Sequence, residues 1–182
     1  HDWGAVVGWT AVLSNPSRIN SWTALSLPHP GAFSAALLND PDQQDRSSYV
    51  AFFQTPWLPE TVFSFNNFSV LKALLGGMSD EKMKEYIDVF SEPGALTSAL
   101  NWYRALGDNS LSNLDNIESL EVNTSTLFLW GNQDPSVGRV AVDGMAEFMK
   151  GSYTNVELEA GHWLLVDKPE RVISEILIHI DQ

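Results

Sequence analysis

The 182-residue chain contains no cysteine. Disulfide bonds, cysteine-ligated metal sites and a cysteine nucleophile are therefore excluded. Basic residues are also few: 10 lysines and arginines stand against 23 acidic residues, for a formal net charge of −13. Such a chain lacks the stripe of basic residues that neutralises phosphates, so we expect no nucleic-acid partner and no attraction to an anionic membrane surface.

A long apolar run is missing as well. No stretch of the sequence reaches the roughly 20 apolar residues that span a bilayer, and no signal peptide is recognisable. The chain starts without methionine and inside a motif, so we expect the native protein to have further sequence upstream of His1. The lack of a span favours a cytoplasmic location, while a membrane anchor upstream of His1 stays an open alternative.

The chain begins with the sequence HDWGA, followed by apolar residues at helical spacing up to Leu13. A nucleophile elbow places a nucleophile between two small residues at a sharp strand-to-helix turn. Asp2 occupies the nucleophile position and Gly4 the second small position, so the first small residue and its strand would lie upstream. An aspartate before an apolar helix is more often a simple N-cap, and the choice between the two roles depends on partners elsewhere.

Two such partners follow downstream. Residues 126–131 are predicted to form a buried strand, and Asp134 lies in the loop after it, at the end where open parallel sheets keep functional residues. A second short strand, 156–159, is followed by His162 in a turn. The order nucleophile, acid, histidine is that of the α/β-hydrolases. We therefore predict a triad with Asp2, in which Asp134 orients His162, over the alternatives of a turn-forming aspartate and a structural histidine.

The other histidines are predicted to have structural or supporting roles. His29 is flanked by prolines, and His179 lies in the last predicted helix. His1 is expected beside the site without taking part in the chemistry.

Helical periodicity dominates the middle of the chain, between the predicted strand at 18–27 and the strand that begins at 126. We divide the chain into residues 1–31, the start of the hydrolase core with elbow, helix and strand; residues 32–120, a helical lid; and residues 121–182, the C-terminal part of the core.

Two helices carry clear capping signals. Ser79 is predicted to cap a helix of the lid, with acidic residues in its first turn. Asp167 is predicted to cap the last helix, which carries a buried apolar stripe at Val172, Ile173, Ile176, Leu177 and Ile180.

Taken together, the motifs resemble those of the epoxide hydrolases, in the epoxide-hydrolase-like branch of the α/β-hydrolase superfamily. The resemblance runs over essentially the whole chain and rests on the order and spacing of seven segments. These are HDWGA (1–5), PHPGAF (28–33), SYVAFFQTPWLPE (48–60), FSEPGAL (90–96), NWYRA (101–105), LFLWGNQD (127–134) and GHWLLVDKPE (161–170). It implies an α/β fold, namely a partial α/β-hydrolase fold of late parallel strands and flanking helices with an inserted all-helical lid.

A carboxylate nucleophile suits attack on a saturated electrophilic carbon, giving an alkyl-enzyme ester that His162 hydrolyses by activating water. The resemblance implies that Tyr49 and Tyr103 protonate the opened epoxide oxygen, although lid tyrosines in general more often only pack. The backbone N–H of Trp3, next to the nucleophile, is expected to donate to the oxyanion. The second oxyanion donor would lie upstream of Asp2.

Three functions remain open from the sequence. The first is hydrolysis of a small apolar epoxide by water to a vicinal diol, with no metal or organic cofactor. The second is a haloalkane dehalogenase with the same nucleophile, in which the side chain of Trp3 would hold the leaving halide. The third is a non-catalytic fragment, because the chain is predicted to be truncated at its N-terminus. The oligomeric state is not predicted.

Overall fold

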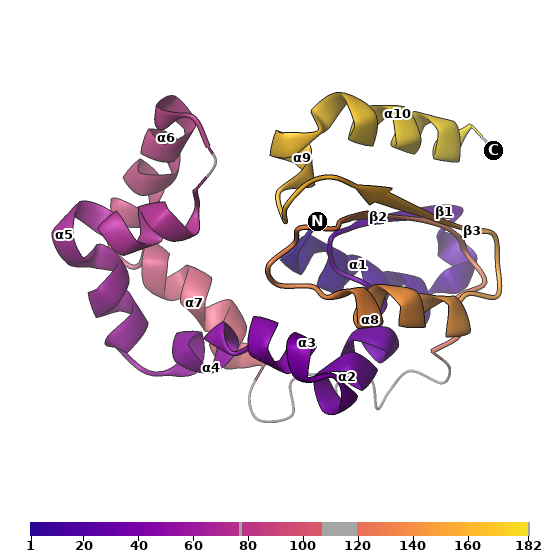
Figure 1. Ribbon diagram of the computed structural model, residues 1–182, viewed down its shortest axis with the longest axis horizontal. Helices are drawn as coiled ribbons and strands as arrows, with labels where there is room; N and C mark the ends of the chain where they lie inside the picture. Colours follow the sequence, from indigo (N-terminus) through magenta and orange to yellow (C-terminus); the bar gives the residue numbers. More distant parts are fainter. Residues whose placement is uncertain (77, 107–119, 182) are drawn as a thin grey trace. The chain divides into compact units, whose positions relative to one another are not determined.

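A computed structural model describes residues 1–76, 78–106 and 120–181 (Figure 1). Its contacts divide the chain into two compact units. The first unit contains residues 1–47 and the described residues from 120 onward, and the second contains the described residues between 48 and 106.

The first unit is built on a parallel sheet with the strand order β1-β2-β3. β1 spans Ser21–Leu25, β2 spans Ser125–Gly131 and β3 spans Tyr153–Leu158. β2 pairs in parallel with both neighbours and is almost entirely buried, as expected for a strand covered on both faces. The carboxyl ends of the three strands therefore meet at one edge, where the loops of an open parallel sheet carry functional residues.

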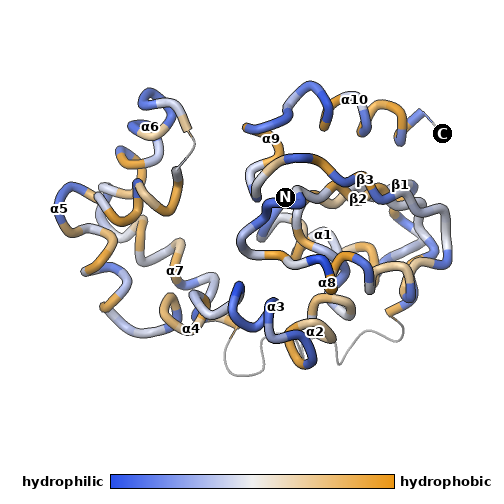
Figure 2. Tube along the Cα trace, viewed as in Figure 1, coloured by the Kyte–Doolittle hydropathy of each residue, from blue (hydrophilic) through white to orange (hydrophobic). Residues whose placement is uncertain are grey.

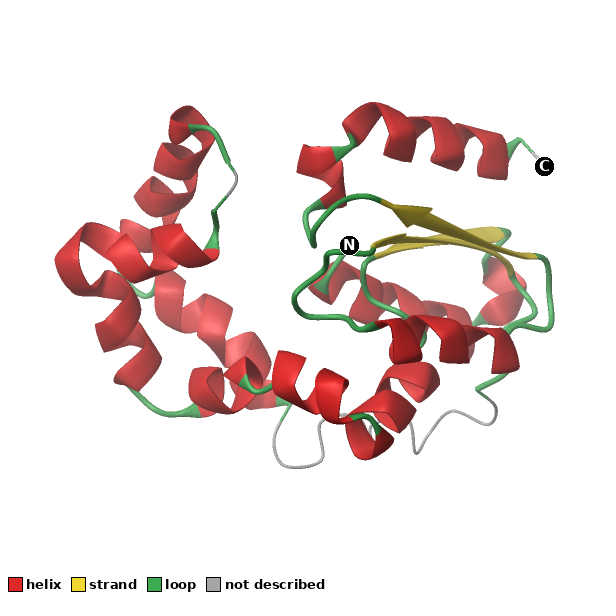
Figure 3. Cartoon of the chain, viewed as in Figure 1, coloured by secondary structure: helices red, strands yellow, loops and turns green. Residues whose placement is uncertain are grey.

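Helices cover both faces of this sheet (Figure 3). One face carries α1 (Trp3–Ser14), α2 (Pro30–Asn39) and α8 (Arg139–Asp143), and the other carries α9 (Leu164–Asp167) and α10 (Pro169–Ile180). Two further elements, η1 and η3, are short 3₁₀ turns at Pro16–Arg18 and Gly144–Glu147.

The core follows from the alternation of side chains along β2. Phe128 and Trp130 belong to the apolar cluster with α1, α2 and α8, whereas Leu127 and Leu129 belong to the cluster with α9 and α10. Successive residues of a strand point to opposite faces, so one buried strand anchors two hydrophobic layers.

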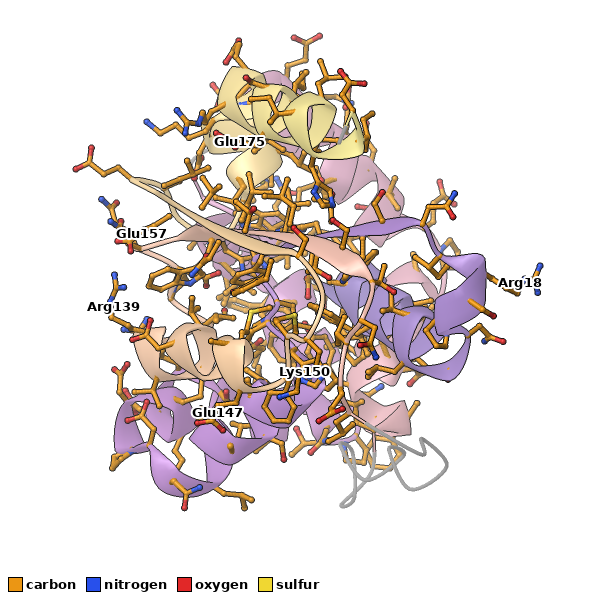
Figure 4. The ribbon with its side chains drawn as sticks, turned by 90° about the vertical axis from the view of Figure 1, so that its right-hand side faces the viewer. Arg18, Arg139, Glu147, Lys150, Glu157 and Glu175 are labelled. Carbon is orange, nitrogen blue, oxygen red and sulfur yellow. The ribbon has the colours of Figure 1, made fainter. Side chains whose placement is uncertain are left out.

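An ion pair links α8 to the sheet at the surface. The Nη2 of Arg139 lies 2.8 Å from the Oε1 of Glu157 on β3 (Figure 4). Both side chains are about half exposed, at 53% and 42%, so water and salt screen much of their attraction.

The predicted strand at 18–27 is longer than the strand observed. β1 begins only at Ser21, because Pro16 opens the 3₁₀ turn η1 and the chain reaches extended geometry after it. Beyond Leu25, Ser26 turns the chain with a positive φ of 63°.

Asp167 does not cap the last helix, and this prediction is wrong. The N-cap of α10 is Lys168, and no side chain caps that end. Asp167 instead accepts a hydrogen bond from the backbone N–H of Gly161 at 3.1 Å. The carboxylate of Asp167 therefore bonds the loop before α9 instead of the N-terminus of α10.

The predicted buried stripe of α10 is also wrong in part. Figure 2 shows hydrophobic and hydrophilic residues recurring along this helix. Val172 is fully buried and Ile176 packs against the core. Three other members of the stripe are more than half exposed, namely Ile173, Leu177 and Ile180. The apolar arc of α10 is thus wider than the part that the described sheet covers.

Over its described residues, the second unit contains the helices α4 (Tyr49–Gln54), α5 (Leu58–Leu74), α6 (Asp80–Ser91) and α7 (Ala95–Ala105). Non-helical backbone from Phe65 to Phe68 divides α5 into two helical stretches. The predicted cap of α6 is confirmed, because the hydroxyl of Ser79 accepts a hydrogen bond from the N–H of Lys82 at 3.4 Å.

The helical segment predicted at 32–120 is divided between the units. α2 and α3 (Pro41–Arg46) belong to the first unit, and the second unit begins at Ser48. Residues 107–119 of that segment lie outside the described residues.

Candidate active site

Asp2 lies at a strained turn that leads into α1. Its backbone has φ 51° and ψ −127°, a conformation that side-chain-bearing residues rarely adopt and that clusters at functional sites. Its carbonyl accepts hydrogen bonds from the N–H groups of Ala5 at 2.8 Å and Val6 at 3.2 Å. Its carboxylate makes no capping bond, so the simple N-cap role is not observed. The Oδ2 atom lies 3.8 Å from the Nε2 of His162.

Asp134 lies in the loop after β2 and is buried, with 1% of its surface exposed. Its Oδ1 accepts hydrogen bonds from the N–H groups of Ser136 at 2.7 Å and Val137 at 3.2 Å. Its Oδ2 lies 2.9 Å from the Nδ1 of His162. A carboxylate only accepts, so Nδ1 carries the proton of this bond.

His162 lies between these two carboxylates in the loop after β3. Burial lowers the pKa of His162, but the hydrogen bonds and negative charges of Asp134 and Asp2 outweigh it and raise the pKa to about 9. The imidazole is therefore protonated at neutral pH in the free protein. Nδ1 faces the buried acid and Nε2 faces the more exposed Asp2, which is the arrangement of a nucleophile, a base and an orienting acid.

The carbonyl of His162 accepts three hydrogen bonds. The hydroxyl of Ser26 and the Nε2 of His1 each lie at 2.8 Å, and the N–H of Leu164 lies at 3.1 Å. The ring of His1 also lies 4.7 Å from that of His162, beside the site as predicted. Ser26 is not among the predicted site residues, although its position at the carboxyl end of β1 is the kind of place where parallel sheets carry functional residues.

The remaining predicted site residues lie on three helices. Trp3 is the first residue of α1, where backbone N–H groups point along the helix toward its N-terminal end. Tyr49 on α4 and Tyr103 on α7 belong to the second unit, with ring centroids 6.2 Å apart in an edge-on arrangement. Both rings pack edge-on against Phe53, at 5.1 and 4.8 Å.

His29 has the structural role that was predicted. It is fully buried, and its Nδ1 accepts a hydrogen bond from the N–H of Gly31 at 3.1 Å, capping α2. Its ring stacks on Phe148 at 4.4 Å. Burial lowers the pKa of His29 to about 4, so it is neutral at physiological pH.

Over residues 1–76, 78–106 and 120–181, no cluster of three or more histidine or acidic side chains could hold a metal ion. None of the helices in the same ranges is long and apolar enough to cross a membrane.

Residues 1–169 match the family model of the alpha/beta hydrolase fold. The chain belongs to the α/β-hydrolase fold family. The predicted fold class is thereby confirmed, and the loops after β2 and β3 carry the acid and the histidine in the order of that family.

Known proteins similar to this α/β-hydrolase include several named epoxide hydrolases. The chain is 35% identical over 184 residues to epoxide hydrolase 4 of Homo sapiens, covering 94% of this chain and 49% of that protein. It is 30% identical over 187 residues to the AB hydrolase superfamily protein YfhM of Bacillus subtilis, covering 99% and 64%. The chain thus spans about half the length of the human relative.

The chain is also similar to a solved structure of an epoxide hydrolase. The crystal structure of the Bacillus megaterium epoxide hydrolase in complex with an inhibitor superimposes with a TM-score of 0.87 at 28% identity. The match covers 100% of this chain and 68% of that one.

Proposed function

We propose that this chain carries the catalytic residues of an epoxide hydrolase that forms vicinal diols through an ester on Asp2. The observation that supports the proposal is the placement of one imidazole between two carboxylates. His162 has Nδ1 at 2.9 Å from buried Asp134 and Nε2 at 3.8 Å from Asp2. Similarity to proteins named epoxide hydrolases supports the substrate class.

In the first step, a carboxylate oxygen of Asp2 attacks one ring carbon of the epoxide. The carbon–oxygen bond of the ring breaks, and the product is an ester on Asp2 with an alkoxide on the neighbouring carbon. The alkoxide takes a proton from the hydroxyl of Tyr49 or Tyr103, and the tyrosine recovers its proton from solvent. The tyrosine role rests on the resemblance of their motifs and on their pairing within the second unit.

In the second step, His162 becomes the base. Ester formation removes the charge of Asp2, which is one of the two carboxylates that raise the pKa of His162. The imidazolium therefore loses its proton to solvent more readily than in the free protein. Its Nε2 then takes a proton from water, which attacks the ester carbonyl and releases the diol and the carboxylate of Asp2. The backbone N–H of Trp3 is proposed to donate to the oxyanion of this step.

The test is a single turnover of the protein, at its full natural length, with excess enzyme over styrene oxide in ¹⁸O-labelled water. We expect a diol without label in that turnover and heavy oxygen in the peptide that contains Asp2, because water attacks the ester and not the epoxide. Label in the diol of the first turnover would overturn the covalent route.

Substrate class is tested in parallel with a panel of terminal epoxides and 1-haloalkanes. Diol formation without halide release supports the proposal. Halide release without diol formation would assign the chain to the dehalogenase alternative, in which a leaving halide needs no proton donor. Absence of both reactions would support a non-catalytic role.

A further inference from the structure

The loop that carries Asp134 contacts a short helix from a distant part of the chain. This helix, α3, begins after Asp40, whose carboxylate accepts hydrogen bonds from the N–H groups of Asp42 and Gln43 at 3.3 Å. Two side chains of α3, three positions apart and therefore on one face, bind the backbone of the loop.

The first of these side chains is Gln43, which is fully buried. Its Nε2 donates to the carbonyl of Ser136 at 2.9 Å and to the hydroxyl of Ser47 at 3.0 Å. Its Oε1 accepts a hydrogen bond from the N–H of Gly138 at 2.8 Å. A buried amide is costly unless both of its ends are bonded, so these contacts fix both the amide and the loop.

The second side chain is Arg46, which is about one third exposed. Its Nη1 donates to the backbone carbonyl of Asp134 at 2.6 Å, and its Nε bonds to the Oδ2 of Asp42 at 2.7 Å. The pair with Asp42 holds the guanidinium in the orientation that reaches the loop.

The helix and the loop approach each other closely at Gly138. A Cβ atom at this position would lie 3.0 Å from the Oδ2 of Asp42, 3.3 Å from the Nε of Arg46 and 3.4 Å from the Oε1 of Gln43. The glycine therefore allows contacts that a larger residue would disturb.

The loop that Gln43 and Arg46 bind also orients the carboxylate of Asp134. The Oδ1 of Asp134 is held by the N–H groups of Ser136 and Val137. Gln43 and Arg46 bind the backbone of the same loop at Asp134, Ser136 and Gly138. With Oδ1 fixed, Oδ2 faces the Nδ1 of His162 at 2.9 Å.

We propose that Gln43, assisted by Arg46, is a positioning residue for the acid of the triad. Gln43 touches no reacting atom; it fixes the loop so that one oxygen of Asp134 faces His162. The proposal deepens the proposed function and rests on it for the effect on rate.

The test compares Gln43→Met with Gln44→Met in the full-length protein. Methionine matches glutamine in size and helix propensity but removes the hydrogen bonds. Gln44 is a matched control, because it is exposed on the same helix and its side chain bonds the carbonyls of Leu37 and Leu38, away from the loop of Asp134. We expect Gln43→Met to lower kcat for epoxide hydrolysis about 100-fold with little change in KM. Gln44→Met should stay within about twofold of the parent.

A titration of the His162 ring by NMR separates positioning from a loss of folded protein. The titratable groups that face this ring are Asp134, Asp2 and His1. We expect the pKa of His162, raised to about 9 in the parent, to move toward 6.5 in Gln43→Met, because Asp134 no longer holds Nδ1 firmly. An unchanged titration together with an unchanged kcat would overturn the proposal.

The titration does not depend on activity. If the parent hydrolyses no epoxide, the proposed function fails, while the shift of His162 in Gln43→Met still decides whether the residue positions Asp134. If Gln43→Met does not fold, Arg46→Gln serves instead, because this partly exposed side chain loses only its contacts to Asp134 and Asp42. A folded Arg46→Gln with the parent's titration and kcat would then overturn the proposal.

Discussion

The two compact units hold their candidate functional side chains in different ways. In the first unit, Asp134 and His162 are fixed by hydrogen bonds of 2.7–3.2 Å from backbone and side-chain groups. In the second unit, Tyr49 and Tyr103 meet edge-on and pack against Phe53. Hydrogen bonds fix direction as well as distance, whereas aromatic contacts tolerate a range of geometries. The hydrogen bonds around Asp134 and His162 are therefore expected to be sensitive to single-atom changes.

The largest effect is expected at Asp2. Replacing it with asparagine removes the nucleophile but keeps the size of the side chain and its tolerance of positive φ. We expect diol formation to fall at least about 10⁴-fold, with the circular dichroism spectrum unchanged. Residual activity within tenfold of the parent would remove Asp2 from the mechanism.

A smaller loss is expected in the second unit. Tyr49→Phe and Tyr103→Phe each remove one hydroxyl and keep the ring packing, so each should lower kcat about 10-fold to 100-fold, and the double variant should lose about 10²–10⁴-fold. Tyr86→Phe is the matched control, because the side chain of Tyr86 is exposed on α6. Parent-like activity in the double variant would show that neither tyrosine donates the proton.

Two ion pairs, one in each unit, differ in how far they are buried and are therefore expected to differ in their contribution to stability. Arg104 binds both oxygens of Glu60, at 2.7 and 2.8 Å, and each side chain is only 20% exposed. Arg104→Met is expected to lower the free energy of unfolding by about 1–2 kcal/mol. Arg139→Met breaks the more exposed pair with Glu157 in the first unit. This variant should lower the free energy of unfolding by less than Arg104→Met. Denaturant unfolding checks both, and an equal cost would contradict the role of burial.

The last prediction concerns pH. The pKa of His162 is raised in the folded protein from 6.5 to about 9. A raised pKa contributes stability that is fully present below about pH 6.5 and is lost as pH rises through about 9. Thermal unfolding across this window should therefore show a declining difference between the parent and His162→Gln. A difference that grows with pH would contradict the assigned charge state.

The sequence was sufficient to predict the fold class. It also named Asp2, Asp134 and His162, which the structure brings together, and their catalytic roles stay predictions. The buried strands and their loops are visible as local patterns in the sequence. The order of Asp2, Asp134 and His162 along the chain then matches the order of nucleophile, acid and histidine in the α/β-hydrolases. The positions of Tyr49 and Tyr103 were predicted from motif resemblance alone, and their catalytic role stays a prediction.

The supporting contacts could not be predicted from the sequence. Gln43 binds residues 93 and 95 positions away, and no local periodicity indicates such a contact. Ser26 reaches the carbonyl of His162 across 136 positions. The predicted cap at Asp167 is wrong because a capping pattern does not show which nearby N–H group a carboxylate bonds, and this one bonds Gly161. The stripe of α10 was overestimated because periodicity shows which residues are apolar and not what covers them.

The central claim is that Asp2 becomes an ester that His162 must release. The most direct measurement is the intact mass of His162→Gln after incubation with styrene oxide, followed by peptide mapping. We expect a mass increase of one substrate molecule, located on the peptide that contains Asp2 and absent from the double variant Asp2→Asn/His162→Gln. A folded His162→Gln protein that forms no adduct, or forms it at another residue, would show that Asp2 is not the nucleophile whose ester His162 releases.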